Sequence, residues 1–348
     1  MPASRTIAQH DPAMAHALPL IDMVCRLAGP FGFVEEARAA LMRQGVLAAV
    51  RRHDTPALFD WLMNVLSYQG IADRVARQYL RAHGNVTWAE LERALKRKPS
   101  CTKLGGYWLF HDCGYEKGSG ICSEPNHIAG CPLPKHMLRN GRLNQTAYSL
   151  FLFMRDVAGG DLVQWIDNQL AACAAAPEAD TLAAMRSVLV EPLRGVYGIS
   201  DKVITMALSS LLLSTGARRP HWLDVGASFV VVDTLVHNFL HRTGILHEFD
   251  ADHAYGAACY RPNGCADLID RIASQIDAQA FNPTFPQVFP RFVQLAIWRY
   301  CSEGGLDICN GNRLDDRGPC DNVYCQLRSR CERVTLHKTQ QNSVIYAA

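Results

Sequence analysis

Along most of this chain, apolar residues recur every three or four positions, the spacing that gathers them on one face of an α-helix. Residues 34–50 show the pattern clearly, and Thr87 followed by Glu90 predicts a capping box at the start of a later helix. Further helices are predicted over residues 57–68, 71–82, 88–97, 144–157, 161–173, 181–190, 201–214, 234–243, 266–279 and 287–302. The alternation typical of strands is scarce, and the β-branched run 229–232 is its best candidate. The pattern therefore predicts an all-α fold.

Two long segments interrupt the helical pattern. Residues 98–141, called the inserted segment below, are rich in glycine, proline, histidine and cysteine, and residues 304–333 are rich in glycine and cysteine. Both are longer than ordinary connections between helices, so something other than an apolar core must hold them. Clusters of cysteine can do so as metal ligands.

Composition and charge narrow the class of protein. Of the 348 residues, 49% are hydrophobic and the formal net charge is only +2, which excludes an intrinsically disordered chain. No uninterrupted apolar run is long enough to span a membrane, and the first 20 residues lack the apolar core of a secretion signal. We therefore expect a cytoplasmic protein without membrane attachment. The 28 arginines against seven lysines suit phosphate recognition, but any DNA-binding face must be a local patch.

Two further segments carry candidate chemistry. Gly195 and Gly198 lie in a turn between two predicted helices, and Ser200 or Asp201 can cap the second of them. Backbone N–H groups exposed by such a turn can bind a DNA phosphate; the alternative is an ordinary interhelical turn. Asp233 follows an apolar run and starts a helix, where it is either a catalytic carboxylate or only a cap.

The order of these features is turn, Lys202 on the helix after it, apolar run, and then Asp233. It closely resembles the helix-hairpin-helix DNA glycosylase superfamily, in particular the endonuclease III and adenine glycosylase branch. Residues 198–202 (Gly-Ile-Ser-Asp-Lys) stand where the family has Gly-Val-Gly-x-Lys, and residues 232–235 (Val-Asp-Thr-Leu) where it has Val-Asp-Thr-His. The predicted helix that ends at residues 66–69 (Leu-Ser-Tyr-Gln) is similar to the family's opening helix, which ends in Leu-Ser-x-Gln.

The resemblance implies a role for each matching residue. The residues expected to contact DNA are Gln69, Gly195, Gly198 and Ser200. In the family the glutamine reaches the DNA stack near the vacated base; the alternative for Gln69 is a solvated helix end. Asp233 is expected to stabilise positive charge at the sugar C1′, and Lys202 is expected to attack C1′ and form a Schiff base that permits strand nicking.

The chain departs from the family pattern in several places. Ser200 replaces the second glycine of the hairpin, and Leu235 replaces a common histidine. Residues 98–141 and 215–229 look like insertions. These differences affect the expected substrate more than the expected fold.

The C-terminal cysteine set consists of Cys309, Cys320, Cys325 and Cys331, separated by 10, 4 and 5 residues. The family's iron–sulfur loop begins with Gly-x3-Cys and closes with Cys-x5-Cys, as residues 305–309 and 325–331 do. The resemblance implies a [4Fe–4S] cluster on these four thiolates, where it needs no redox role to hold the loop. Zinc bound by four cysteines is the alternative, and Cys301 is a rival first ligand.

The inserted cysteine set consists of Cys101, Cys113, Cys122 and Cys131, separated by 11, 8 and 8 residues. We expect the last three to bind a metal, with Cys101 or His127 as the fourth ligand. Zinc is the first choice, a second iron–sulfur cluster is its rival, and free buried thiols are the third possibility. The remaining cysteines, Cys25, Cys173, Cys259 and Cys265, are expected to pack in apolar surroundings. The aromatic residues Tyr107, Trp108 and Phe110 are expected to anchor the inserted segment more than to stack on a base.

These observations combine into one expectation. Residues 1–55 would pack with an iron–sulfur lobe over 234–348, and residues 56–233 would form the hairpin lobe that carries the inserted segment. The protein would be a monomeric DNA glycosylase with AP lyase activity, nucleoid-associated and acting on double-stranded DNA that contains a modified or damaged base. The alternatives are a monofunctional glycosylase in which Asp233 activates water, a non-catalytic DNA-binding or damage-sensing protein on the same fold, and an unrelated redox metalloprotein.

Overall fold

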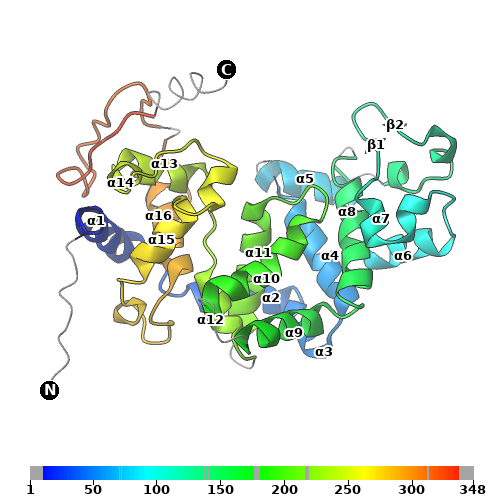
Figure 1. Cartoon of the computed structure of the whole chain (residues 1–348). Helices are drawn as coiled ribbons and strands as arrows, with labels where there is room; N and C mark the ends of the chain where they lie inside the picture. Colours follow the sequence, from blue (N-terminus) through cyan, green and yellow to red (C-terminus); the bar gives the residue numbers. More distant parts are fainter. Residues whose placement is uncertain are drawn as a thin grey trace. The chain divides into compact units, whose positions relative to one another are not determined.

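The all-α expectation is confirmed by the structure, a computed structural model that describes residues 11–69, 71, 73–136, 138–139, 141–175, 181–215, 219–311 and 313–336. The sheet among these residues is a single antiparallel pair of two-residue strands. The chain divides into two compact units, one made of Met1–Phe33 with Ala227–Ala348 and the other of Val34–Gly226. Figure 1 labels the elements of both.

The unit Val34–Gly226 is built around helices that the apolar spacing predicts. Its helices are α2 (Phe33–Arg43), α3 (Val46–Arg52), α4 (Thr55–Leu66), α5 (Asp73–His83), α6 (Trp88–Lys96), α8 (Asn144–Leu152), α9 (Leu162–Ala174), α10 (Thr181–Arg194), α11 (Asp201–Thr215) and, at the boundary, α12 (Trp222–Ser228). Every residue of α8 is buried, and α8 continues as a π-helical turn over Phe153–Val157. Helix α4 packs against α3, α8, α9 and α11, so α4 and α8 supply much of the core.

Local sequence signals explain where several of these helices begin. The Asp54 side chain accepts the Ala57 N–H at 3.1 Å and caps α4. The predicted capping box of α6 is present, because the Thr87 N–H donates to Glu90 at 2.8 Å.

The expected insertion over residues 215–229 contains α12, which packs in this unit. The Trp222 indole is buried and donates to Asp167 on α9 at 2.7 Å, and Arg219 pairs with the same carboxylate. The run 229–232, the strand candidate, is not a strand: it is buried coil whose Val232 N–H donates to the Tyr260 hydroxyl at 2.9 Å. The Tyr260 side chain, 28 residues further along the chain, therefore provides the hydrogen-bond acceptor that a neighbouring strand would provide for the Val232 N–H in a sheet.

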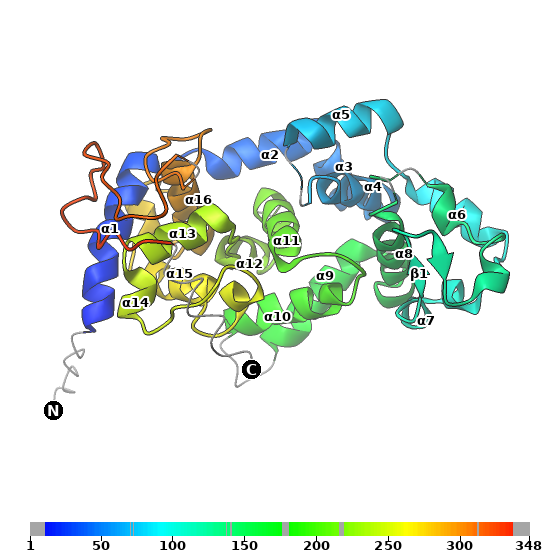
Figure 2. The same cartoon turned by 90° about the horizontal axis from the view of Figure 1, so that it is seen from above.

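The inserted segment folds as short pieces around its cysteines. These pieces are η1 (Thr102–Gly105), α7 (Tyr107–Phe110), β1 (Tyr115–Glu116), β2 (Ile121–Cys122), η2 (Pro125–His127) and η3 (Leu133–Lys135). Figure 2 shows α7 and β1 beside α8, against which α7 packs. Tyr107 and Phe110 are buried, as expected of anchors, but the same expectation is wrong for Trp108, which is 70% exposed.

The unit of Met1–Phe33 and Ala227–Ala348 is also helical. It contains α1 (Pro12–Ala28), α13 (Thr234–Arg242), α14 (Ile245–Glu248), η6 (Ala257–Tyr260), α15 (Cys265–Ala273), η7 (Ala278–Ala280) and α16 (Pro290–Cys301). Helix α16 packs against α1, α13 and α15, and α1 presents fully buried residues such as Leu20 and Val24 to this core. The predicted helix over 266–279 is shorter than expected, because α15 ends at Ala273.

The observed boundaries between the units differ from the expected ones. They fall at 33/34 and 226/227, whereas the sequence analysis placed them at 55/56 and 233/234. Residues 34–55 belong with the hairpin unit because α3 packs on α4 and α11.

No single described helix is both long and apolar enough to cross a membrane. Among the described helices, α1 and α2 reach the necessary length and apolar content only when the two are counted together.

Candidate active-site residues and metal centres

The hairpin joins α10 to α11, and its two glycines are required for different reasons. Gly198 has a φ of +73°, a left-handed conformation that favours glycine, and a Cβ there would lie 2.9 Å from the Thr146 hydroxyl. Gly195 does not have positive φ, contrary to the expectation of a tight turn. Its constraint is space, because a Cβ would lie 2.6 Å from the Tyr107 hydroxyl of the inserted segment.

Gln69 contacts this hairpin directly. Its side-chain Nε2 donates to the Gly198 carbonyl at 2.7 Å, and its Oε1 accepts the Ser200 N–H at 3.3 Å and the Ser200 hydroxyl at 3.4 Å. The amide therefore holds the turn from both sides, and Gln69 is not merely a solvated helix end. The hydroxyl of Ser200 thus takes part in this contact.

Lys202 is the second residue of α11 and is half-buried. The adjacent carboxylate of Asp201 pairs with Arg194 at 2.6 Å. Lys202 itself makes no ion pair with any residue that the structure describes. Within the part of the chain that the structure describes, no carboxylate therefore neutralises the Lys202 amine.

Asp233 is the N-cap of α13 in the other unit. Its Oδ1 accepts the Val236 N–H at 3.0 Å, and the side chain is half-buried. The residue before it is held by Tyr260, whose hydroxyl accepts the Val232 N–H and donates to the Val232 carbonyl at 3.3 Å. Burial lowers the pKa of Arg291 to about 10, and the nearby negative charge of Asp233 opposes this shift. Asp233 therefore caps α13 and also interacts electrostatically with the buried guanidinium of Arg291.

The C-terminal cysteine set lines one small cavity, together with Tyr300, Arg242 and Arg328. The Cys325 sulfur is 3.3 Å from the Tyr300 hydroxyl, and Cys331 lies 3.4 Å from the Arg242 carbonyl. Cys301, the rival ligand, is fully buried on α16 and does not line this cavity.

Buried guanidinium donors without acceptors surround the same cavity. Arg242 is 1% exposed, and only its Nη2 has a partner, Asp316. Its Nε and Nη1, and Nη1 of Arg328, are buried with no hydrogen-bond partner among the described residues. Unpaired buried donors are costly, so the cavity fits an anionic group rich in acceptors. Four thiolates with the sulfides of an iron–sulfur cluster are such a group.

The inserted cysteine set also converges on one cavity, which His127 lines as well. Three of its sulfurs accept a backbone N–H from two residues further on: Cys122 from Glu124 at 3.4 Å, Cys113 from Tyr115 and Cys131 from Leu133. Such bonds stabilise thiolates and partly offset burial, which raises the pKa of Cys113 and of Cys131. The His127 ring is occupied by the Ser100 hydroxyl at 2.9 Å and by Glu124 at 3.6 Å, which favours Cys101 as the fourth ligand.

A third group of ligands was missed by the sequence analysis. The His2Cys2 cluster consists of His237, His253, Cys259 and Cys265, whose ligand atoms all lie within 4.8 Å of one another, so it could bind a metal ion. Cys259 and Cys265 are buried, as expected, but they face imidazoles rather than apolar side chains alone. The hydrogen bond from Cys265, with those from the two histidines, lowers the pKa of Cys259. Only the regular spacing of 253, 259 and 265 hinted at it in the sequence.

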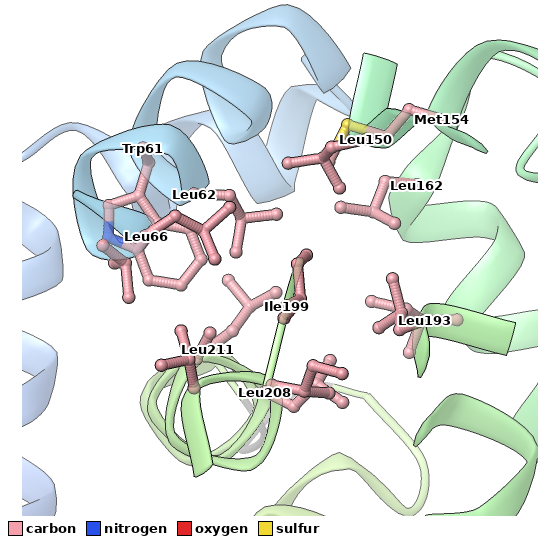
Figure 3. A pocket seen from close by; sticks show the side chains of 15 residues that line it. Trp61, Leu62, Leu66, Leu150, Met154, Leu162, Leu193, Ile199, Leu208 and Leu211 are labelled. Atoms are coloured by element: carbon pink, nitrogen blue, oxygen red, sulfur yellow. The ribbon is translucent and has the colours of Figure 1, made fainter. Parts of the chain in front are cut away.

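An apolar cavity of about 40 Å³ lies inside the hairpin unit. Trp61 and Leu66 of α4, Leu150 of α8, Leu208 of α11 and Ile199 of the hairpin point into it (Figure 3). It offers no acid, base or nucleophile, so it belongs to the core rather than to a reaction site.

Comparison of the chain with protein-family models, with curated proteins and with solved structures found no match.

Proposed function

We propose that this protein is a DNA glycosylase with AP lyase activity, acting on double-stranded DNA that contains a modified or damaged base. The contact between Gln69 and the hairpin carries the proposal. The sequence analysis matched Gln69 and residues 198–202 to separate family motifs, and they meet through three hydrogen bonds although 129 residues separate Gln69 from Gly198. If the two short motifs matched the family only by chance, there would be no reason for the two segments to contact each other in the fold.

The two candidate catalytic residues have the chemistry that the reaction needs. The Lys202 amine would attack the sugar C1′ of a flipped-out nucleotide, the N-glycosidic bond would break, and the base would leave with a proton. The Asp233 carboxylate, whose Oδ1 is fixed by the cap of α13, would stabilise the positive charge that develops at C1′. The Schiff base on Lys202 would then permit β-elimination and strand cleavage.

The hairpin would bind the DNA backbone. The first N–H groups of α11 have no partners within their own helix, and the positive end of the helix dipole lies at the same place. Gln69 would hold Gly198 and Ser200 in the conformation that presents these groups. A phosphate bound here would position the duplex without reading its sequence.

The metal centres would be structural. The C-terminal cysteine set would hold a [4Fe–4S] cluster, and the buried donors of Arg242 and Arg328 would face its sulfur atoms. Bound there, the cluster would tie the irregular segment after α16 to α13. The inserted cysteine set would hold one further metal centre, zinc or a second cluster, which metal analysis would identify.

The experiment is incubation of the full chain with duplexes bearing a panel of modified bases, read on a denaturing gel, with borohydride trapping of any covalent adduct. Wild-type protein should be trapped and should nick one or more duplexes. Lys202→Gln should abolish both while binding of abasic-site DNA persists. Lys96→Gln, at an exposed lysine that pairs with Glu92, is the matched control and should behave as wild type.

The other outcomes identify the alternatives. Base excision without trapping would mean a monofunctional glycosylase, and binding without excision across the panel would mean a non-catalytic DNA-binding protein. Undiminished trapping of Lys202→Gln would assign the nucleophile to another amine.

A further inference from the structure

We propose that the His2Cys2 cluster binds one structural zinc ion. This inference does not rest on the proposed glycosylase function, because it follows from the cluster's own geometry. Its four residues come from α13, the loop after α14, η6 and the first position of α15, so the fold alone brings them together.

The distances match those around a tetrahedral zinc ion. His237 Nδ1 lies 3.3 Å from the Cys265 sulfur and 3.6 Å from the Cys259 sulfur. The Cys265 sulfur lies 3.3 Å from His253 Nε2. Zinc bonds of about 2.0–2.1 Å to nitrogen and about 2.3 Å to sulfur place adjacent ligand atoms about 3.6 Å apart at the tetrahedral angle. These three of the six separations between ligand atoms are therefore close to the edge lengths of such a tetrahedron, and all six are within 4.8 Å.

The surroundings orient one of the imidazoles for metal binding. His253 Nδ1 lies 2.7 Å from the Ala251 carbonyl and can only donate to it, so in the neutral ring the lone pair is on Nε2, the nitrogen that faces Cys265. This is the usual arrangement behind a metal-bound histidine. Cys265 is the first residue of α15, so this helix fixes the position of its sulfur in the cluster.

Charge and burial favour zinc in a structural role. Cys259 and Cys265 are fully buried and His237 is 6% exposed. Two thiolates balance one Zn²⁺, so the loaded site is neutral, whereas a single buried thiolate would be left uncompensated. Four protein ligands fill the tetrahedron and leave no open position for water or substrate, as in structural rather than catalytic zinc sites.

The ion would hold the loop that adjoins Asp233. The His237 ring is 5.8 Å from the Tyr255 ring, and burial together with the charge of Asp233 raises the pKa of Tyr255. Tyr260, next to Cys259 in η6, holds the Val232 backbone through its hydroxyl. Zinc would thus fasten both tyrosines beside the start of α13.

The test is elemental analysis of the full chain, measuring zinc and iron separately. The double variant Cys259→Ser with Cys265→Ser should lose about one zinc per chain and keep its iron. Cys173→Ser, at a lone half-exposed cysteine of α9, is the control and should lose none. Equal zinc in the double variant and the wild type would overturn the proposal.

A second measurement on wild-type protein covers the case in which the double variant does not fold. Alkylation of cysteines, mapped by mass spectrometry, should spare Cys259 and Cys265 until a zinc chelator is added. Both should then react, and added zinc should restore their protection. Cys25, which is buried in α1 and belongs to none of the three ligand sets, should stay unreactive throughout. If alkylation of Cys259 and Cys265 does not respond to the chelator, the cluster holds no zinc.

Discussion

Replacement of Gly195 with alanine tests whether the inserted segment supports the hairpin. The new Cβ would lie 2.6 Å from the Tyr107 hydroxyl and 3.3 Å from the Pro192 carbonyl. Tyr107 cannot easily move away. It is 2% exposed, its N–H donates to Asp156 at 2.8 Å, and its ring packs on Phe153 at 5.5 Å between centroids.

The cost of this change can be worked from the contacts. Forcing an extra carbon into a packed site costs about 1–3 kcal/mol, and the gain of alanine over glycine in the unfolded chain offsets about 0.4–1 kcal/mol of it. The net loss for Gly195→Ala is therefore about 0–2.6 kcal/mol, with a middle value of about 1.3 kcal/mol. For a unit of this size the middle value corresponds to a fall of about 3–5 °C in Tm.

A second substitution isolates the contact. Tyr107→Phe removes the atom closest to the new Cβ and loses one long hydrogen bond, 3.4 Å to the Pro192 carbonyl, at a cost of no more than about 1 kcal/mol. In the double variant the clash is relieved, so the two changes should couple favourably by about 1 kcal/mol.

Stability would be followed by urea unfolding and by thermal melting of the metal-loaded protein. Gly118→Ala is the matched control, because a Cβ at this glycine of the inserted segment meets nothing within 4 Å. If Gly195→Ala unfolds like the control, or if Tyr107→Phe does not reduce its effect, Tyr107 does not support the hairpin and the reasoning fails.

Three further predictions concern the chemistry and the metals. Asp233→Asn keeps a good helix cap, worth about 1 kcal/mol, but removes the negative charge, so base excision should fall by orders of magnitude. Folding and binding to abasic-site DNA should change little, and near-normal excision would mean that Asp233 is only a cap. Purified wild-type protein should be brown, Cys325→Ala should lose both colour and iron, and Arg242→Met should retain less iron than wild type. A colourless protein from anaerobic purification would contradict the cluster assignment. Changing Cys113 and Cys122 together to serine should remove one metal centre without affecting those in the other unit, and an unchanged metal content would mean that packing alone holds the inserted segment.

The sequence was sufficient for features that depend on local spacing. Helical periodicity predicts most of the described helices, and the pair Thr87 and Glu90 predicts the start of α6. Motif resemblance singled out Gln69, although its actual partners in the hairpin follow only from the fold.

Features that depend on tertiary contacts were beyond the sequence. The ligands of the His2Cys2 cluster come from four separate elements at spacings that match no common zinc motif, so nothing local marks His237 as their partner. The run 229–232 has strand-forming residues but meets Tyr260 instead of a second strand. Gly195 is explained by Tyr107, which lies 88 positions earlier in the chain and approaches it only after folding.

The buried guanidinium of Arg242 has a consequence for how the protein matures. Without the proposed cluster on the C-terminal cysteine set, two of its donors have no acceptor among the described residues, and each such donor costs roughly 1–3 kcal/mol when it is kept from water. If the cluster assignment holds, a chain lacking the cluster would lower this cost by letting the segment after α16 move away from α13, which would expose that segment to proteases. Closure of the segment would then follow delivery of the proposed cluster rather than precede it.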